Sequence, residues 1–223
     1  MDHKPNSPSS SPCSLHDLDV AHDGSFVQVD AQQRIDVARW RKAERKRLLA
    51  ARSELSVQVR QRLSDAVARD LDTILSPGPG QIISVYWPFR AELDLRDWMH
   101  SAHMAGARLA LPVVEVKDMP LVFRQWAPGA RMERGIWNIL QPADGEQVSP
   151  TVTIAPLVGH DPDCFRLGYG GGYFDRTLGA AAPRPLTIGV DPPISAIPTI
   201  FPQPHDIPMD VIITGDNAVI RRT

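Results

Sequence analysis

Residues 152–176, which read VTIAPLVGHDPDCFRLGYGGGYFDR, join an apolar run to a glycine-rich loop and a helix-like segment. Residues 152–160 are rich in Val, Ile and Leu, which favours a strand. Four glycines follow between positions 168 and 172, and the pattern predicts that a helix begins near Tyr173 or Phe174. A strand that leads through a loop into a helix is the repeating unit of α/β proteins.

The same alternation of strand and helix extends along the chain on both sides of this stretch. One helix is predicted to begin near Asp36, and a second, with Ser56 as its N-cap, ends at the breaker SPGPG of residues 76–80. Residues 94–105 predict a further helix, and runs rich in Val, Ile and aromatic residues predict strands at 82–89, 108–114, 121–126, 185–190 and 209–216. The sequence therefore predicts a three-layer αβα fold of the α/β class, with a mainly parallel, Rossmann-like sheet flanked by helices in a single domain.

Composition is typical of a soluble protein with one core. The chain has 223 residues, of which 43% are hydrophobic, enough for a sizeable core. Residues 1–30 are rich in Ser, Pro and Asp and are predicted to form a flexible tail, which leaves residues 31–223 as the α/β domain. The formal charge of -2 gives no reason to expect a nucleic acid or an anionic membrane as partner. Composition and charge therefore favour neither of these partners.

The sequence also favours a cytoplasmic location. The two cysteines, Cys13 and Cys164, lie far apart and one falls in the predicted tail, so a structural disulfide is not expected. No apolar run approaches the roughly 18 to 20 residues that span a bilayer, and the N-terminus lacks the apolar stretch of a signal peptide. These features are typical of a protein of a reducing compartment.

The glycine-rich loop has the composition of an anion site. Glycine adopts positive φ angles and lets backbone N–H groups approach a phosphate, and the helix that follows directs its N-terminal dipole to the same place. Arg166 offers a charged fork for phosphate oxygens, and Asp175 offers a hard oxygen ligand for Mg²⁺. The spacing matches neither the P-loop nor the dinucleotide motif, and a tight turn without a ligand accounts for the glycines equally well. Both interpretations stay open at this point.

Longer stretches of the chain carry a family resemblance. The run RLGYGGGYFDRTL, preceded by APLVGHD and followed by IPTIFPQPHDIPMDVIIT, closely resembles the C-terminal signature of the 5-formyltetrahydrofolate cyclo-ligase (methenyltetrahydrofolate synthetase) family. The resemblance continues upstream in YWPFRAELD, LALPVV, MPLVFRQW and GIWNILQP, and in the basic helix WRKAERKRLLAARSELS. It covers roughly residues 37–216 and leaves the tail unmatched. The resemblance implies a monomer that acts on small molecules.

The resemblance implies an ATP- and Mg²⁺-dependent ring closure. In that family, 5-formyltetrahydrofolate becomes 5,10-methenyltetrahydrofolate with release of ADP and phosphate, through a phosphorylated formyl group (an iminium phosphate). The resemblance implies catalytic roles for Arg166 and Tyr173 and magnesium positions at Asp175 and Asp206. It places ATP on the segment Arg166, Leu167, Gly168, Tyr169, Gly170, Gly171, Gly172, Tyr173 and Phe174.

Further residues are assigned by the same resemblance. Arg41 and Arg45 match a lysine and an arginine that reach ATP from one helix face, although a solvated basic face would be the ordinary interpretation. Glu92, Trp137, Tyr169 and Tyr173 are implied in folate binding, while a helix-start carboxylate and a core tryptophan are the alternatives for Glu92 and Trp137. Some relatives carry arginine at the position of Tyr169 and lysine at that of Gly171, so this loop is less basic.

The sequence admits three other interpretations. A cyclo-ligase-like protein that binds folate or nucleotide without turnover fits the changes at Arg41, Tyr169 and Gly171. An NAD-binding domain is disfavoured because the glycine spacing is wrong and the run lies late in the chain. A zinc site in the cluster of His160, Asp161, Asp163 and Cys164 is disfavoured because no second pair stands at ligand spacing.

Overall fold

The computed structural model describes residues 18–20, 26–28 and 30–222. The predicted tail lies largely outside the described residues, but within it the strands β1 (Leu18–Val20) and β2 (Phe26–Gln28) pair antiparallel. The helices are α1 (Ala31–Glu54), α2 (Val57–Leu75), α3 (Arg96–Met104) and α4 (Tyr173–Ala180). The strands are β1 (Leu18–Val20), β2 (Phe26–Gln28), β3 (Ile82–Ser84), β4 (Arg108–Val113), β5 (Val122–Trp126), β6 (Met132–Arg134), β7 (Leu140–Pro142), β8 (Val152–Pro156), β9 (Gly159–His160), β10 (Arg166–Leu167), β11 (Leu186–Val190), β12 (Val211–Ile213) and β13 (Val219–Arg221).

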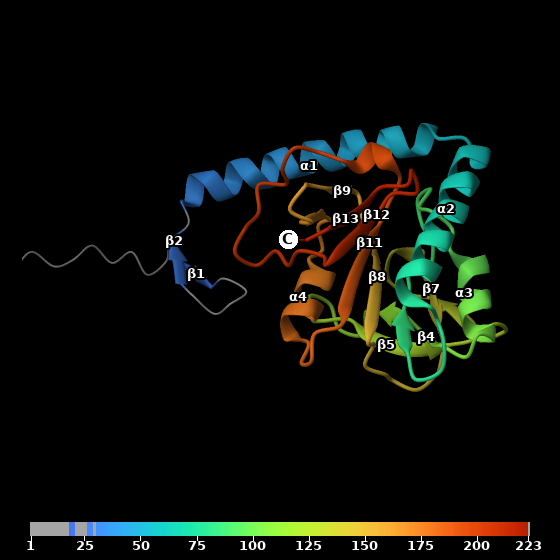
Figure 1. The fold of residues 1–223 in the computed structure, drawn as a ribbon. Helices are drawn as coiled ribbons and strands as arrows, with labels where there is room; N and C mark the ends of the chain where they lie inside the picture. The colour runs from blue at the N-terminus through green and yellow to red at the C-terminus, as the bar shows by residue number, and fades with distance from the viewer. Residues whose placement is uncertain (1–17, 21–25, 29, 223) are drawn as a thin grey trace, which may run out of the picture.

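Seven of these strands form one mixed sheet in the order β13-β12-β11-β8-β3-β4-β5 (Figure 1). The neighbours from β12 to β4 pair in parallel, and β13 and β5 are added antiparallel at the two edges. Side chains alternate between the two faces of the sheet. Ile154 belongs to the core that also holds residues of α2 and α3, whereas Ala155 belongs to a second core with Leu178 of α4. The prediction of a mainly parallel sheet between helical layers is confirmed.

The strand order fixes where a ligand can bind. The five parallel strands lie in the order β4-β3-β8-β11-β12, so the chain first adds β4 on one side of β3 and then adds β8, β11 and β12 on the other. In open α/β sheets, ligands bind beyond the carboxyl ends of the strands where this reversal occurs. Here that point lies between β3 and β8.

Helix α1 crosses the carboxyl ends of the strands (Figure 1). Leu48 of α1 packs with Val158 and Leu167, which follow β8. The helix begins at Ala31, not near Asp36 as predicted, because the side chain of Asp30 accepts a hydrogen bond from the backbone N–H of Gln32 and caps it. Residues 31–36 are exposed, so they carry no apolar periodicity that the sequence could reveal. The predicted cap of α2 at Ser56 is confirmed.

Other differences from the prediction concern short strands. The run at 82–89 forms a strand only as far as Ser84, and the rest leaves the sheet. The run at 152–160 breaks after Pro156, and β9 pairs with β10 instead of continuing β8. The strands β6, β7 and β13 were not predicted; each has three residues, and most of these are exposed or half-buried, so their periodicity is weak.

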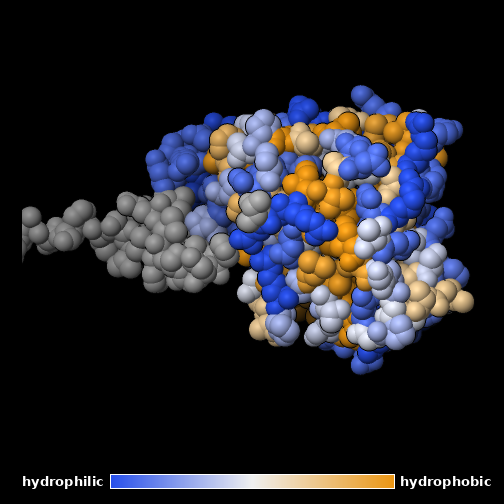
Figure 2. Space-filling model, viewed as in Figure 1, coloured by the Kyte–Doolittle hydropathy of each residue, from blue (hydrophilic) through white to orange (hydrophobic). Residues whose placement is uncertain are grey.

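Figure 2, drawn in the view of Figure 1, shows hydrophobic residues gathered down the middle of this face, where the strands lie, and hydrophilic residues along the outward side of α2. This distribution agrees with helices that bury one face against the sheet. Among the helices that the structure describes, none combines the length and the apolar character that a lipid bilayer would require.

Candidate active site

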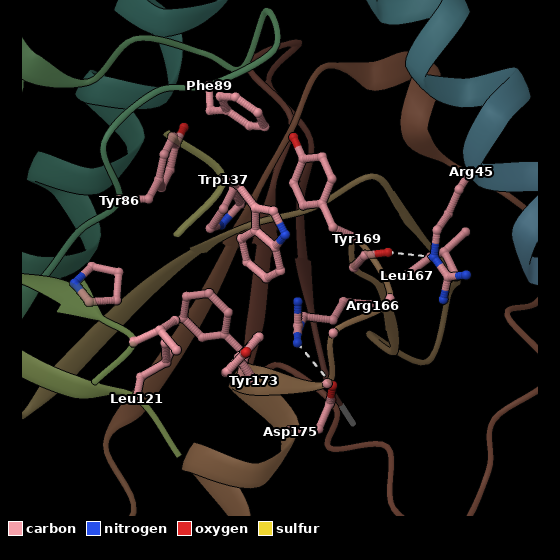
Figure 3. A pocket seen from close by; sticks show the side chains of 18 of the residues that line it. Arg45, Tyr86, Phe89, Leu121, Trp137, Arg166, Leu167, Tyr169, Tyr173 and Asp175 are labelled. Carbon is pink, nitrogen blue, oxygen red and sulfur yellow. Dashed lines mark hydrogen bonds and ion pairs between the residues drawn. The ribbon is translucent and has the colours of Figure 1, made fainter. Parts of the chain in front are cut away.

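A cavity of about 640 Å³ lies at the predicted switch point. It is lined by α1, by the segment that follows β3, by the end of β4, by the residues around Trp137, by the glycine-rich loop and by residues 203–206. In Figure 3, Trp137 and Tyr173 face Arg166 and Tyr169 across the same space. The cavity therefore brings together segments that are far apart in the sequence, as expected for an α/β ligand site.

The glycines of the loop are required by its geometry. Gly170 and Gly172 have φ angles of +98° and +63°, a region that residues with a Cβ atom rarely adopt. A Cβ atom at Gly171 would lie 2.8 Å from the ring of Tyr173, and one at Gly168 would lie 2.7 Å from a guanidinium nitrogen of Arg166. The loop therefore needs bare backbone to bring these side chains close to the main chain.

Arg166 belongs to β10, directly before the loop, and its buried side chain lies against the first turn of α4. Its Nη2 atom lies 3.0 Å from Oδ2 of Asp175, and its guanidinium lies 4.9 Å from the ring centroid of Phe174. Its Nε atom is buried and has no hydrogen-bond partner within the described part of the chain. A buried donor without a partner is costly, and a substrate oxygen in the cavity would satisfy it.

Helix α1 contributes three arginines to the lining of the cavity, Arg34, Arg41 and Arg45. The guanidinium of Arg41 is buried, donates to Oδ1 of Asp206 at 3.1 Å, and also donates to the carbonyl oxygens of Ile200 and Phe201. Arg45 donates from Nε to the carbonyl oxygen of Gly168 at 2.6 Å. Burial, with a smaller effect of the nearby Arg41, lowers the pKa of Arg45 from its ordinary value. The predicted pair four residues apart therefore does line the cavity.

The two predicted magnesium positions lie side by side. Asp175 and Asp206 both line the cavity, and the backbone N–H of Ile207 donates to Oδ1 of Asp175 at 3.3 Å. Each carboxylate is held by an arginine. No group of three or more His, Cys, Asp or Glu that could hold a metal ion is found among the described residues. Mg²⁺ commonly takes one or two carboxylates and completes its shell with substrate phosphates and water, so the pair fits an ion that arrives with a nucleotide.

Trp137 and Tyr173 form the aromatic side of the cavity. Trp137 has a φ angle of +57° and an exposed side chain, and its ring centroid lies 5.5 Å from that of Tyr173. Tyr173 is buried at the first position of α4. Trp137 is therefore not a core residue but an exposed ring beside the glycine-rich loop, where a flat substrate could stack.

Glu92 lies behind the cavity wall rather than in it. It is buried and is absent from the lining of the cavity as the described residues define it. The hydroxyl of Tyr169 donates to Oε1 of Glu92 at 2.7 Å, and the backbone N–H of Phe89 donates to Oε2 at 2.8 Å. The ring of Tyr169 lines the cavity, but its hydroxyl points to Glu92 and not to a phosphate position. The predicted contacts of Glu92 with folate and of Tyr169 with ATP stay predictions.

Two residues of this region were not predicted to have a role. Arg52 of α1 is 2% exposed and donates to Oδ1 of Asp191 at 3.0 Å, to the carbonyl oxygen of Leu157 and to the hydroxyl of Tyr169. Asp191 is 3% exposed and directly follows β11. A charged residue at the carboxyl end of a predicted parallel strand was the one signal that could have pointed to Asp191.

Burial shifts the titration of both carboxyl groups in this network. It raises the pKa of Glu92 from 4.5 to about 7, against the hydrogen bond from Tyr169 and the charge of Arg52. It also raises the pKa of Asp191 from its ordinary value, although the charge and the hydrogen bond of Arg52 oppose this shift. Desolvation therefore outweighs the favourable partners for both carboxylates.

Glu92 is predicted to make the stability of the protein depend on pH. Between its ordinary pKa and its raised pKa, the folded state binds more protons than the unfolded state, so stability falls as pH rises through this range. We expect the free energy of unfolding of the wild type, relative to Glu92→Gln, to fall by about 3 kcal/mol between about pH 5 and about pH 8. Urea unfolding of both proteins across this range measures the difference, and parallel curves would contradict the raised pKa.

Comparison with known proteins identifies the family. The model of the 5-formyltetrahydrofolate cyclo-ligase family matches residues 37–215, which is most of the chain. The chain belongs to this family. The matched range includes every predicted site residue, from Arg41 to Asp206.

Individual cyclo-ligases show how far the similarity reaches. The 5-formyltetrahydrofolate cyclo-ligase of Escherichia coli strain K12 is 30% identical over 133 residues, which cover 57% of this chain and 73% of the relative. That of Mycoplasma pneumoniae is 25% identical over 175 residues, 78% of this chain and 98% of the relative. The solved 5,10-methenyltetrahydrofolate synthetase of Aquifex aeolicus superposes with a TM-score of 0.69 at 29% identity and covers 81% of this chain and 92% of its own. These matches confirm the predicted family and fold, and the chain is an enzyme of the cyclo-ligase type.

Proposed function

We propose that this cyclo-ligase family member converts 5-formyltetrahydrofolate to 5,10-methenyltetrahydrofolate with conversion of ATP to ADP and phosphate, in the presence of Mg²⁺. The observation that supports this most directly is the cavity at the switch point. It gathers Arg41, Arg45, Arg166 and Tyr173 around the glycine-rich loop, all within the range that matches the family.

The reaction requires activation of the formyl oxygen before the ring can close. That oxygen attacks the γ-phosphorus of ATP and ADP leaves, which gives an iminium phosphate. The N10 amine then attacks the formyl carbon, the carbon–oxygen bond breaks, phosphate departs with the formyl oxygen, and N10 loses its proton. Both reacting groups belong to one folate molecule, so the enzyme gains rate by holding it in a closed conformation.

The residues of the cavity have separate tasks in this proposal. Arg166 and Arg45 neutralise charge on the phosphoryl group as it is transferred, and the glycine-rich loop lets backbone N–H groups approach it. Trp137 and Tyr173 hold the flat rings of folate. Asp175 and Asp206 would hold the Mg²⁺ that accompanies ATP, and this ion would neutralise charge on the phosphates. A protein nucleophile is not required.

Turnover of the purified protein tests the proposal. With 5-formyltetrahydrofolate and Mg-ATP, we expect the absorbance of the methenyl product to rise, and to stay at background when ATP is omitted or EDTA removes Mg²⁺. Calorimetric binding of folate or nucleotide without product would instead select the binding protein that lacks turnover. The monomeric state and the cytoplasmic location stay predictions, which gel filtration and cell fractionation would test.

A further inference from the structure

A buried network of four side chains lies behind the wall of the cavity. Arg52 is its centre: its Nη1 atom donates to Asp191 at 3.0 Å and to the carbonyl oxygen of Leu157 at 2.9 Å, and its Nη2 atom donates to the hydroxyl of Tyr169. The Tyr169 hydroxyl donates in turn to Glu92 at 2.7 Å. Among the described residues of this network, Tyr169 alone lines the cavity.

The network joins the elements that form the site. Leu157 follows β8, Asp191 follows β11, and Glu92 lies in the segment that leaves the sheet after β3. Arg52 comes from α1, the helix that also supplies Arg41 and Arg45. The guanidinium of Arg52 therefore connects α1 to the carboxyl ends of β8 and β11. Through the hydroxyl of Tyr169 it also connects α1 to the segment that follows β3.

The hydroxyl of Tyr169 has its orientation fixed by this network. A phenolic hydroxyl has one proton to donate; here Glu92 accepts it, while Arg52 donates to the oxygen. Arg45 lies against both neighbours of Tyr169, Gly168 and Gly170. It donates to the carbonyl oxygen of Gly168 at 2.6 Å. Its guanidinium carbon lies so close to Gly170 that a Cβ atom there would be only 3.4 Å away. A fixed Tyr169 therefore fixes the part of the loop that faces Arg45.

We infer that Arg52 and Asp191 are positioning residues for the cyclo-ligase reaction: they touch no substrate and act by holding Tyr169, and with it the glycine-rich loop, in place. This inference rests on the proposed function of the cavity. The carboxylate of Asp191 and the carbonyl oxygen of Leu157 both accept hydrogen bonds from Nη1 of Arg52. Asp191 therefore helps to keep the guanidinium in position. Without Asp191, Arg52 would be a buried cation without a charged partner and would be free to leave the tyrosine.

A double-mutant cycle between Arg52 and Tyr169 tests the inference. Tyr169→Phe removes only the hydroxyl, and Arg52→Lys keeps the charge but loses the fork that reaches two partners. We expect each variant to lower kcat/KM for ATP about tenfold, and the double variant to be no worse than about twentyfold, because both changes break the same link. A loss of about a hundredfold in the double variant would show independent effects and would overturn the inference.

Two further variants separate positioning from general stability. Asp191→Asn should show the same lack of additivity with Tyr169→Phe. Arg47→Lys, on the exposed side of α1 and paired with Glu44, should leave kcat/KM unchanged; a tenfold loss there would also contradict the inference. All rates are measured well below the melting temperature of each variant, so that loss of folded protein does not imitate loss of activity.

The cycle also distinguishes this inference from the proposed function. If the wild type gives no methenyl product, the proposed function fails. The same four proteins are then compared by their calorimetric affinity for a non-hydrolysable ATP analogue. Non-additive losses of affinity would still support the role of Arg52, and additive losses would overturn it.

Discussion

Arg166→Ala should lower kcat/KM for ATP about a thousandfold while leaving most of the protein folded. Arg166 is the cavity residue whose guanidinium lies against both the glycine-rich loop and Asp175, and its buried Nε atom has no partner in the described residues. A donor placed for charge that develops during phosphoryl transfer contributes about 10²–10³ in rate. In our proposal the guanidinium of Arg166 also contacts the substrate phosphates, and the loss of this contact adds to the effect. Steady-state kinetics with varied ATP, together with calorimetric binding, measure the effect.

Two controls make this result specific to the site. Arg131→Ala removes an arginine whose ion pair with Asp144 is exposed at the surface, so it should change kcat/KM by less than about twofold. Arg166→Lys keeps the charge and should recover only a small part of the activity, because lysine lacks the planar fork. Wild-type ATP affinity in Arg166→Ala would contradict the assignment of Arg166 to the phosphates.

The fold was predictable because its signals are local. Each central strand is a short apolar run, and the one in residues 152–176 leads through glycines to a helix that begins at Tyr173, as predicted. The end of the strand was not predictable in the same way. Leu157 and Val158 are as apolar as the residues of β8. Leu157 shares a core with Ala155 of β8, whereas Val158 belongs to another core beside Leu48 of α1. A periodicity within the run cannot show which element covers each residue.

The site was predictable only where residues belong to one stretch or to a family signature. The pair of Arg41 and Asp206 joins positions 165 residues apart, and nothing in the local sequence of either residue indicates the other. Arg52 was one of several basic residues on α1, and its neighbours do not distinguish a buried arginine from a solvated one. The structure makes this distinction through burial: Arg52 is 2% exposed, whereas Arg39 and Arg47 of the same helix are exposed.

Asp206→Ala should destabilise the protein by about 3–5 kcal/mol, because it leaves the buried guanidinium of Arg41 without its charged partner. Asp206 accepts from two nitrogens of Arg41 and also from the backbone N–H of Gln203, and both side chains of the ion pair are almost completely buried. In the variant the buried charge of Arg41 keeps its desolvation cost but loses the carboxylate that compensates for it. Urea unfolding with the wild type measured in parallel gives the difference in free energy.

The double variant Arg41→Ala/Asp206→Ala separates the two roles that Asp206 has in our proposal. Removal of both charges eliminates the unpaired cation, so the double variant should regain at least half of the stability lost in Asp206→Ala. It should not regain activity, because the proposed ligand of Mg²⁺ is still missing and a cavity arginine has been removed as well. If the double variant were as active as the wild type, neither residue would act on ATP or Mg²⁺. If it regained no stability, the ion pair would not account for the loss in Asp206→Ala, and the contacts of Asp206 with the backbone around Gln203 would be the alternative cause.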